Sequence, residues 1–288
     1  MCRARSAEVP AGFTLKTVKR TPVGWQAAFT VPDESILFQG HFPGRPVIPG
    51  IGFLCMVDET LSATDGGREG PRYTSGLRRI KFRRLVEKGG TFEVLIGHER
   101  TAFGAHHITV GEGGEVVMDG HLIPSDASPS SPDPIPDTDQ KPEPCQITLG
   151  DIIPHERPMR IVDDLVAIRA GEAVTRSAVL HTWPLVVEGS APSTLLIEAV
   201  AQTAAACVGW EQVGEERARG GDYLVGIRKA HLSQPRIDAG QSFVTRVVTI
   251  QKRSNFAVFH GMVTSVGKVL CTATIQAFRP AQGDTKGS

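Results

Sequence analysis

A repeated order of sequence patterns constrains this chain more than any other feature. Each half has one apolar helical stretch followed by several strand-like runs, and a segment at 125–144 separates the halves. That segment has six prolines and five acidic residues, with Ile135 as its only large apolar residue. It can bury too little surface to offset the entropy lost on ordering, so we expect a mobile, extended linker. The chain therefore divides into a domain at about 10–124 and another at about 145–280.

The two apolar stretches predict one buried helix in each half. The stretch at 193–212 is apolar almost all round, which indicates a helix enclosed by the protein rather than one lying on its surface. Pro192 and Ser193 suit its first turn. The counterpart in the first half is the stretch at 51–64, which follows Pro49 and Gly50.

Alternating runs after each helix predict antiparallel strands. The runs that begin at Gly76 and Gly226 each predict two strands joined by a tight turn, near Gly89–Gly90 and Ala239–Gly240. Further alternation follows, and its central EGG and SVGK sequences predict hairpin turns. One helix wrapped by one curved antiparallel sheet in each half is an α+β arrangement. The repeat predicts that the two copies pack against each other as an intrachain pseudo-dimer.

Composition narrows the class of partner and compartment. The chain has 31 basic and 31 acidic residues, so neither a nucleic-acid groove nor a membrane surface is expected as a partner. It has no apolar run long enough to span a membrane and no apolar core of a signal peptide near its start. Five scattered cysteines without a C-x-x-C motif favour reduced thiols. We therefore expect a cytoplasmic protein.

One loop motif indicates a family. Residues 40–50, GHFPGRPVIPG, hold His41 among prolines and glycines. This run resembles the signature of the (3R)-hydroxyacyl-acyl-carrier-protein dehydratases of bacterial fatty acid synthesis, which have the hot-dog fold. IPHERPMRIVDDL (153–165), LLIEAVAQTAA (195–205) and the run from Gly226 are similar to further motifs of that family. The resemblance covers nearly the whole chain outside the termini and the linker, and it implies a tandem double hot-dog.

The two halves depart from the family pattern in complementary ways. The family has a carboxylate fourteen residues after the histidine, where this chain has Cys55. When the two helices are aligned, Glu198 matches Cys55, and Ser190 stands at the histidine position. In the family, the histidine of one subunit meets the acid of the other. The resemblance thus implies one complete site, His41 with Glu198, and an inactive site that pairs Ser190 with Cys55.

The implied activity is dehydration of (3R)-hydroxyacyl thioesters, on acyl carrier protein or coenzyme A, to trans-2-enoyl thioesters in fatty-acid or polyketide-type biosynthesis. A neutral histidine removes the Cα proton, and a protonated carboxylic acid protonates the departing β-hydroxyl. Backbone N–H groups at a helix start stabilise the oxyanion. The candidates are Gly50 in the first half and Ser193 or Thr194 in the second, and the resemblance favours Gly50. Gln202 either orients Glu198 or a water, or satisfies a nearby backbone group. No metal or redox cofactor is needed.

Alternatives remain open at this point. One alternative is another hot-dog enzyme, a thioesterase or an enoyl-thioester hydratase. Another is a non-catalytic subunit that binds acyl chains or completes another dehydratase. Asp58, one turn beyond Cys55, is either a displaced acid or an aspartate on the helix surface, and we expect the second. His155 is grouped with the histidines that show no metal-ligand spacing. The protein is expected as a monomeric pseudo-dimer or a homodimer of it. A basic run either binds an acidic carrier protein or its phosphate, or forms a solvated strand face; it consists of Arg78, Arg79, Lys81, Arg83 and Arg84.

Overall fold

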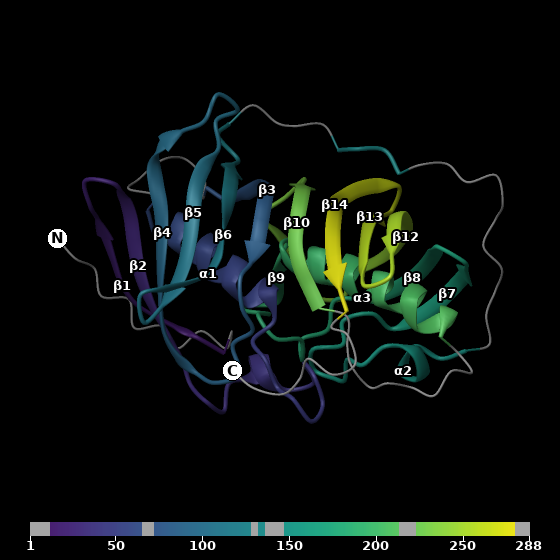
Figure 1. The fold of residues 1–288 in the computed structure, drawn as a ribbon. Helices are drawn as coiled ribbons and strands as arrows, with labels where there is room; N and C mark the ends of the chain where they lie inside the picture. The colour runs from purple at the N-terminus through teal and green to yellow at the C-terminus, as the bar shows by residue number, and fades with distance from the viewer. Residues whose placement is uncertain (1–11, 65–71, 128–131, 136–146, 213–222, 280–288) are drawn as a thin grey trace.

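Twelve strands of the two halves form one continuous antiparallel sheet. The computed structural model describes residues 12–64, 72–127, 132–135, 147–212 and 223–279. The strand order is β1-β2-β4-β5-β6-β3-β10-β14-β13-β12-β8-β7, so six strands of the first half are followed by six of the second (Figure 1). The elements of the first half are β1 (Thr14–Arg20), β2 (Gly24–Val31), the 3-10 turn η1 (Ile36–Phe38), α1 (Gly50–Ala63), β3 (Thr74–Phe82), β4 (Gly90–Arg100), β5 (His106–Glu112) and β6 (Glu115–Pro124).

The second half repeats this order with small additions. Its elements are α2 (Leu149–Ile152), β7 (Asp164–Arg169), β8 (Glu172–Ala178), β9 (Ser190–Pro192), α3 (Leu195–Glu211), β10 (Tyr223–Leu232), β11 (Arg236–Asp238), β12 (Ser242–Arg253), β13 (Phe256–Ser265) and β14 (Lys268–Phe278). Strands β9 and β11 form a separate two-stranded sheet. The α+β prediction of one long helix and one antiparallel sheet for each half is confirmed.

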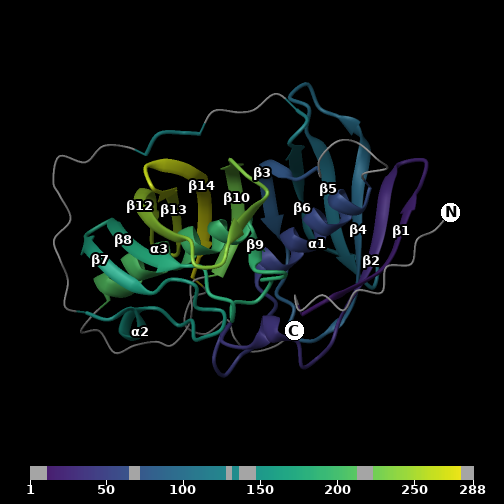
Figure 2. The same cartoon turned by 180° about the vertical axis from the view of Figure 1, so that it is seen from behind.

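The two halves join where β3 pairs with β10. These strands run antiparallel, with Gly76 opposite His231 and Lys81 opposite Gly226. Both long helices lie behind the sheet in Figure 1 and in front of it in Figure 2. Helix α1 packs on strands of the first half and α3 on strands of the second, and the helices also contact each other. The loops at the starts of α1 and α3 therefore lie close to the junction of the halves.

Helix α3 is enclosed, as its apolar sequence predicts. Most of its seventeen residues are buried, including Glu198 and Gln202. Burying these polar side chains costs free energy unless they find hydrogen-bond partners, so their surroundings decide their role. The helix begins at Leu195 rather than at Ser193, and the Ser193 amide donates to the carbonyl of Pro235 at 3.0 Å.

Two predicted strand pairings are wrong, although the strands exist. Strand β3 does not pair with β4, nor β10 with β12. Alternation fixes which face a residue occupies but does not identify the partner strand. The seven residues between β3 and β4 can span up to about 24 Å, which exceeds the roughly 14 Å across three strand spacings. The connection therefore crosses the sheet, and β4 pairs with β2 and β5.

The two predicted hairpin turns are confirmed. Gly113 and Gly114 join β5 to β6, and both have positive φ, as a two-residue hairpin turn requires. Val266 and Gly267 join β13 to β14 in the same way. The EGG and SVGK sequences thus fix the register of both central hairpins.

Part of the predicted linker lies against the second half. Asp133 forms an ion pair with Lys229 of β10, with Oδ1 and Nζ 2.5 Å apart. This contact anchors 132–135, which the prediction of a mobile linker does not anticipate. Residues 128–131 and 136–144 lie outside the described residues, and the domain boundaries at 124 and 145 stay a prediction. Across the described residues, no helix has the length and apolar character needed to cross a membrane.

Candidate active site

The histidine loop holds His41 in a fixed orientation. It follows η1 and ends at α1, and backbone bonds from Val47 to the His41 carbonyl and from Ile48 to the Val86 carbonyl brace it. The Nδ1 atom of His41 lies 3.0 Å from the carbonyl oxygen of Val47. Because a carbonyl oxygen can only accept, Nδ1 carries the proton of the neutral ring. The free lone pair is therefore on Nε2, as a general base requires.

Glu198 enters the same region from the first turns of α3. Its Oε1 accepts a hydrogen bond from Gln202 Nε2 at 2.9 Å. Gln202 also donates to the Met159 carbonyl at 2.8 Å and accepts from the Ile161 amide at 2.9 Å. Both interpretations of Gln202 thus describe its contacts, because it touches the carboxyl and satisfies two backbone groups at once.

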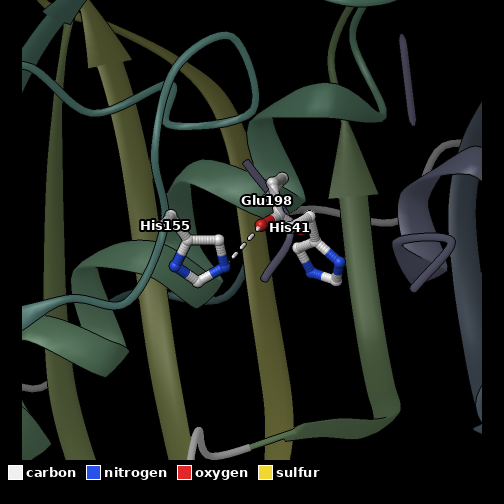
Figure 3. Close-up of side chains that lie close together, drawn as sticks. All are labelled: His41, His155 and Glu198. Atoms are coloured by element: carbon white, nitrogen blue, oxygen red, sulfur yellow. Dashed lines mark ion pairs between the residues drawn. The ribbon is translucent and has the colours of Figure 1, made fainter. Parts of the chain in front are cut away.

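His41 and Glu198 line one pocket across the junction of the halves. A ring nitrogen of His41 and a carboxyl oxygen of Glu198 lie within 4.8 Å of each other (Figure 3). The pocket encloses about 780 Å³ of empty space, part of it open to solvent. Its wall is largely apolar and comes from both halves; it includes Phe42, Val47, Phe53, Phe82, Leu85, Ala201, Val208, Leu224, Phe259 and Ile275. An acyl chain fits such a lining.

Burial shifts the pKa values of both groups in useful directions. Desolvation lowers the pKa of His41 to about 4, against the opposing effect of its backbone hydrogen bond to Val47. Desolvation also raises the pKa of Glu198 from 4.5 to about 7, and the hydrogen bond from Gln202 opposes this rise. His41 is therefore neutral near pH 6, while Glu198 is mostly protonated. A neutral base beside a protonated acid is the state that proton abstraction followed by hydroxyl loss needs.

His155 is a third titratable group at this site, which the sequence motifs do not predict. Its Nε2 lies 3.6 Å from Glu198 Oε1, and its ring centroid lies 5.3 Å from that of His41. The side chain is buried and lines the same pocket. The available signal was its position in the family-like segment 153–165, since spacing in the sequence could not place it beside His41. One atom from each of the three side chains could bind a cation, because these atoms lie within 4.8 Å of one another.

The two candidate oxyanion donors lie in different places. Gly50 is the first residue of α1 and lines the pocket with His41 and Glu198. The N–H of a first helical residue has no acceptor within the helix, so it is available to a substrate. Ser193 does not line this pocket, and its N–H already donates to Pro235. This geometry corrects the expectation for Ser193 and leaves Gly50 as the candidate.

A second pocket occupies the position expected for the inactive site. It contains Cys55 and Asp58 from α1, together with Arg236. Ser190, at the histidine position, accepts a hydrogen bond from Arg236 Nε at 2.7 Å. No histidine lines this second pocket among the described residues. The described wall of the second pocket therefore has no histidine base that would correspond to His41 in the first.

The expectation that Asp58 lies on a helix surface is wrong. Its carboxyl accepts hydrogen bonds from the hydroxyls of Thr74 and Thr194. Burial raises its pKa to about 6, against the effect of these hydrogen bonds. Helical periodicity could not show that β3 and the start of α3 cover this position.

The basic run spans the end of β3 and the two residues after Phe82, and it is partly neutralised within the protein. Arg83 pairs with Asp119, and Arg84 pairs with Glu112. The Arg78 guanidinium lies 5.4 Å from the centroid of the Phe103 ring. Arg84 is the member of the run that also lines the first pocket. The ion pairs of Arg83 and Arg84 favour a solvated, ion-paired surface at these two positions.

Known proteins match both halves. Residues 147–287 match the ApeP-like family model, described as ApeP dehydratase, and residues 17–116 match the ApeI-like model, described as ApeI dehydratase. The 3-hydroxyacyl-[acyl-carrier-protein] dehydratase FabZ of Shewanella baltica is 31% identical over 111 residues, which cover 35% of this chain and 68% of that protein. FabZ of Latilactobacillus sakei is 37% identical over 68 residues, which cover 22% of this chain and 49% of that protein. The chain thus spans about half to two thirds of these curated relatives.

The fold also matches solved structures along nearly its whole length. One match is the crystal structure of the dehydratase domain of RzxB from Pseudomonas fluorescens. The superposition covers 92% of this chain and 98% of the RzxB chain, with a TM-score of 0.63 and 13% sequence identity. The shared sheet, the two enclosed helices and the pocket at their junction define a double hot-dog protein. The chain belongs to the family of 3-hydroxyacyl-[acyl-carrier-protein] dehydratases.

Proposed function

We propose that this protein is a hydro-lyase that converts (3R)-hydroxyacyl thioesters to trans-2-enoyl thioesters in fatty-acid or polyketide-type biosynthesis. The observation that carries the proposal is the arrangement of His41 and Glu198. Each half supplies one of them, and both line a single apolar pocket. Membership of the dehydratase family supports the same chemistry.

The reaction begins with His41 as the base. Its Nε2 accepts the Cα proton, and the electrons of the C–H bond move into an enolate whose oxygen becomes negative. The Gly50 N–H at the start of α1 stabilises that oxygen, and such a donor typically contributes about 3 kcal/mol to the transition state. The missing side chain at Gly50 also matters, because an added Cβ would lie 2.6 Å from the Phe82 ring.

Glu198 completes the reaction as the acid. The enolate electrons form the Cα=Cβ bond, and the Cβ–O bond breaks. The departing hydroxyl takes the Glu198 proton and leaves as water. Return of the proton from His41 to Glu198 restores the starting state, and a ring nitrogen of His41 lies within 4.8 Å of a carboxyl oxygen of Glu198, which suits transfer through one water. Gln202 holds Glu198 in place throughout.

The carrier and the compartment are parts of this proposal. The names of the FabZ relatives point to acyl carrier protein as the carrier. The pocket is partly open to solvent and its wall is largely apolar, so it suits an acyl chain carried on either thioester, including coenzyme A esters. We assign the protein to the cytoplasm, as a monomeric pseudo-dimer or a homodimer of it.

The test is incubation with 3-hydroxyacyl thioesters of graded length on both carriers, with enoyl product as the readout. We expect enoyl product from the wild type and none from His41→Ala or Glu198→Gln, with both variants folded by circular dichroism. Release of free thiol without enoyl product would replace the proposal by a thioesterase. Near-wild-type turnover by either variant would refute the site.

A further inference from the structure

We propose that His155 is a positioning residue for Glu198, which fixes the acidic proton on one carboxyl oxygen and stabilises the carboxylate as that proton leaves. This inference rests on the proposed dehydratase function. In this proposal His155 acts on the carboxyl group of Glu198 and not on the substrate. The first observation is the contact of 3.6 Å between His155 Nε2 and Glu198 Oε1 (Figure 3).

The segment that carries His155 is held from both halves. The Glu156 amide donates to the Gly40 carbonyl at 3.0 Å, next to His41 in the histidine loop. Gly40 itself has no room for a side chain, because an added Cβ would lie 2.1 Å from the Glu156 carbonyl oxygen. Four residues after His155, the Met159 carbonyl accepts a hydrogen bond from the Gln202 side chain. His155 therefore lies beside both the acid and the base, in a segment whose following residues are held by Gly40 and Gln202.

The hydrogen bonds of Glu198 are asymmetric. Gln202 donates to Oε1, and His155 approaches the same oxygen. Within the described part of the chain, Oε2 has no such partner. An oxygen that faces N–H donors accepts, so the proton of the neutral acid lies on Oε2. Oε2 is then the atom that protonates the departing hydroxyl.

The ring of His155 is free to supply the N–H that this arrangement needs. Its Nδ1 is buried and has no hydrogen-bond partner within the described residues, so nothing there fixes a tautomer. The neutral ring is also favoured, because burial and the nearby His41 lower the pKa of His155. The tautomer with hydrogen on Nε2 satisfies Glu198. At 3.6 Å the contact is longer than a hydrogen bond, and such contacts tighten as charge develops during the reaction.

Three substitutions test this role. His155→Leu removes the N–H at similar size, whereas His155→Gln keeps a donor. His260→Leu is the control, because His260 is also buried with an unpartnered ring nitrogen but does not line the pocket. The readout is kcat/KM against pH, whose alkaline limb reports loss of the Glu198 proton.

We expect His155→Leu to lower kcat by about 10- to 100-fold and to move the alkaline limb up by about one pH unit, because a donor to the carboxylate is lost. His155→Gln should restore most of the rate and the position of the limb. His260→Leu should leave both unchanged. An unshifted limb in His155→Leu, or a glutamine variant no better than the leucine variant, overturns the proposal.

A second measurement needs neither turnover nor a His155 variant. Nitrogen-15 NMR of the histidine rings distinguishes the two neutral tautomers. We expect His155 to carry its proton on Nε2 and to respond to a titration that disappears in Glu198→Gln. A ring protonated on Nδ1 throughout overturns the proposal. If the wild type dehydrates no substrate but His155 behaves as expected, the proposed function fails and the positioning role stands.

Discussion

Replacing Glu198 with glutamine is expected to stabilise the protein at neutral and alkaline pH. The carboxyl is buried, and its pKa rises from 4.5 to about 7 on folding because of desolvation. Between these two values the folded protein keeps a proton that the unfolded chain releases. The stability that this proton contributes is complete below about pH 4.5 and is lost as the pH rises through about 7.

The size of the effect follows from the shift. Each unit of pKa difference corresponds to about 1.4 kcal/mol, so ionisation of Glu198 lowers the free energy of unfolding by about 3 kcal/mol above pH 7. Glutamine stays neutral at every pH. Its amide oxygen can take the place of Oε1 and accept from Gln202. The substitution therefore removes the loss without removing that hydrogen bond.

The assay is urea unfolding of wild type and Glu198→Gln at intervals from about pH 4 to about pH 8. The two proteins should be similarly stable at the acidic end, and the variant should gain steadily until the difference reaches about 3 kcal/mol. Glu156→Gln is the matched control, because Glu156 lies exposed in the segment beside the site. A difference between wild type and Glu198→Gln that does not change with pH would refute the reasoning.

Three further predictions concern activity. The plot of kcat/KM against pH should be bell-shaped. The value should rise as His41 loses its proton near pH 4 and fall as Glu198 loses its proton near pH 7. Activity that stays undiminished well above pH 7 would contradict these roles. Gly50→Ala should lower kcat by about 100-fold, because the new Cβ displaces Phe82 or the helix start that carries the oxyanion donor. A wild-type kcat in a folded variant would exclude Gly50 as the oxyanion donor. Cys55→Ala should keep kcat within about twofold of wild type, since Cys55 lines the second pocket; a large loss in steady-state turnover would show that the second pocket takes part.

The sequence predicts the parts of the fold that depend on local chemistry. Two glycine-containing turns fix the β5–β6 and β13–β14 hairpins, and apolar character on all sides identifies α3 as an enclosed helix. It does not predict that β3 pairs with β10, because backbone hydrogen bonding across the junction leaves no mark on side-chain alternation. The same lack of partner information led to the wrong pairing of β3 with β4.

The candidate site divides in the same way. His41 and Glu198 could be placed together because each stands in a motif whose missing partner stands in the other half. Gln202 follows from its place one turn after Glu198. His155 could not be placed, since it reaches the pocket through a loop that is held by the Gly40 carbonyl and the Gln202 side chain. For Ser193, the competing bond to Pro235 arises only in the folded chain.

A mixing experiment tests most directly whether the two halves of one chain build the catalytic site. Purified His41→Ala and Glu198→Gln chains are assayed separately and together, after joint unfolding and refolding. Each variant alone should lose at least about 1000-fold in enoyl product formation, as expected for loss of an essential acid or base. Their mixture should stay equally inactive, because each chain has a single His41–Glu198 pair and one member of that pair is replaced. Recovery of dehydration in the mixture would place the histidine and the glutamate of one site on different chains and contradict the account.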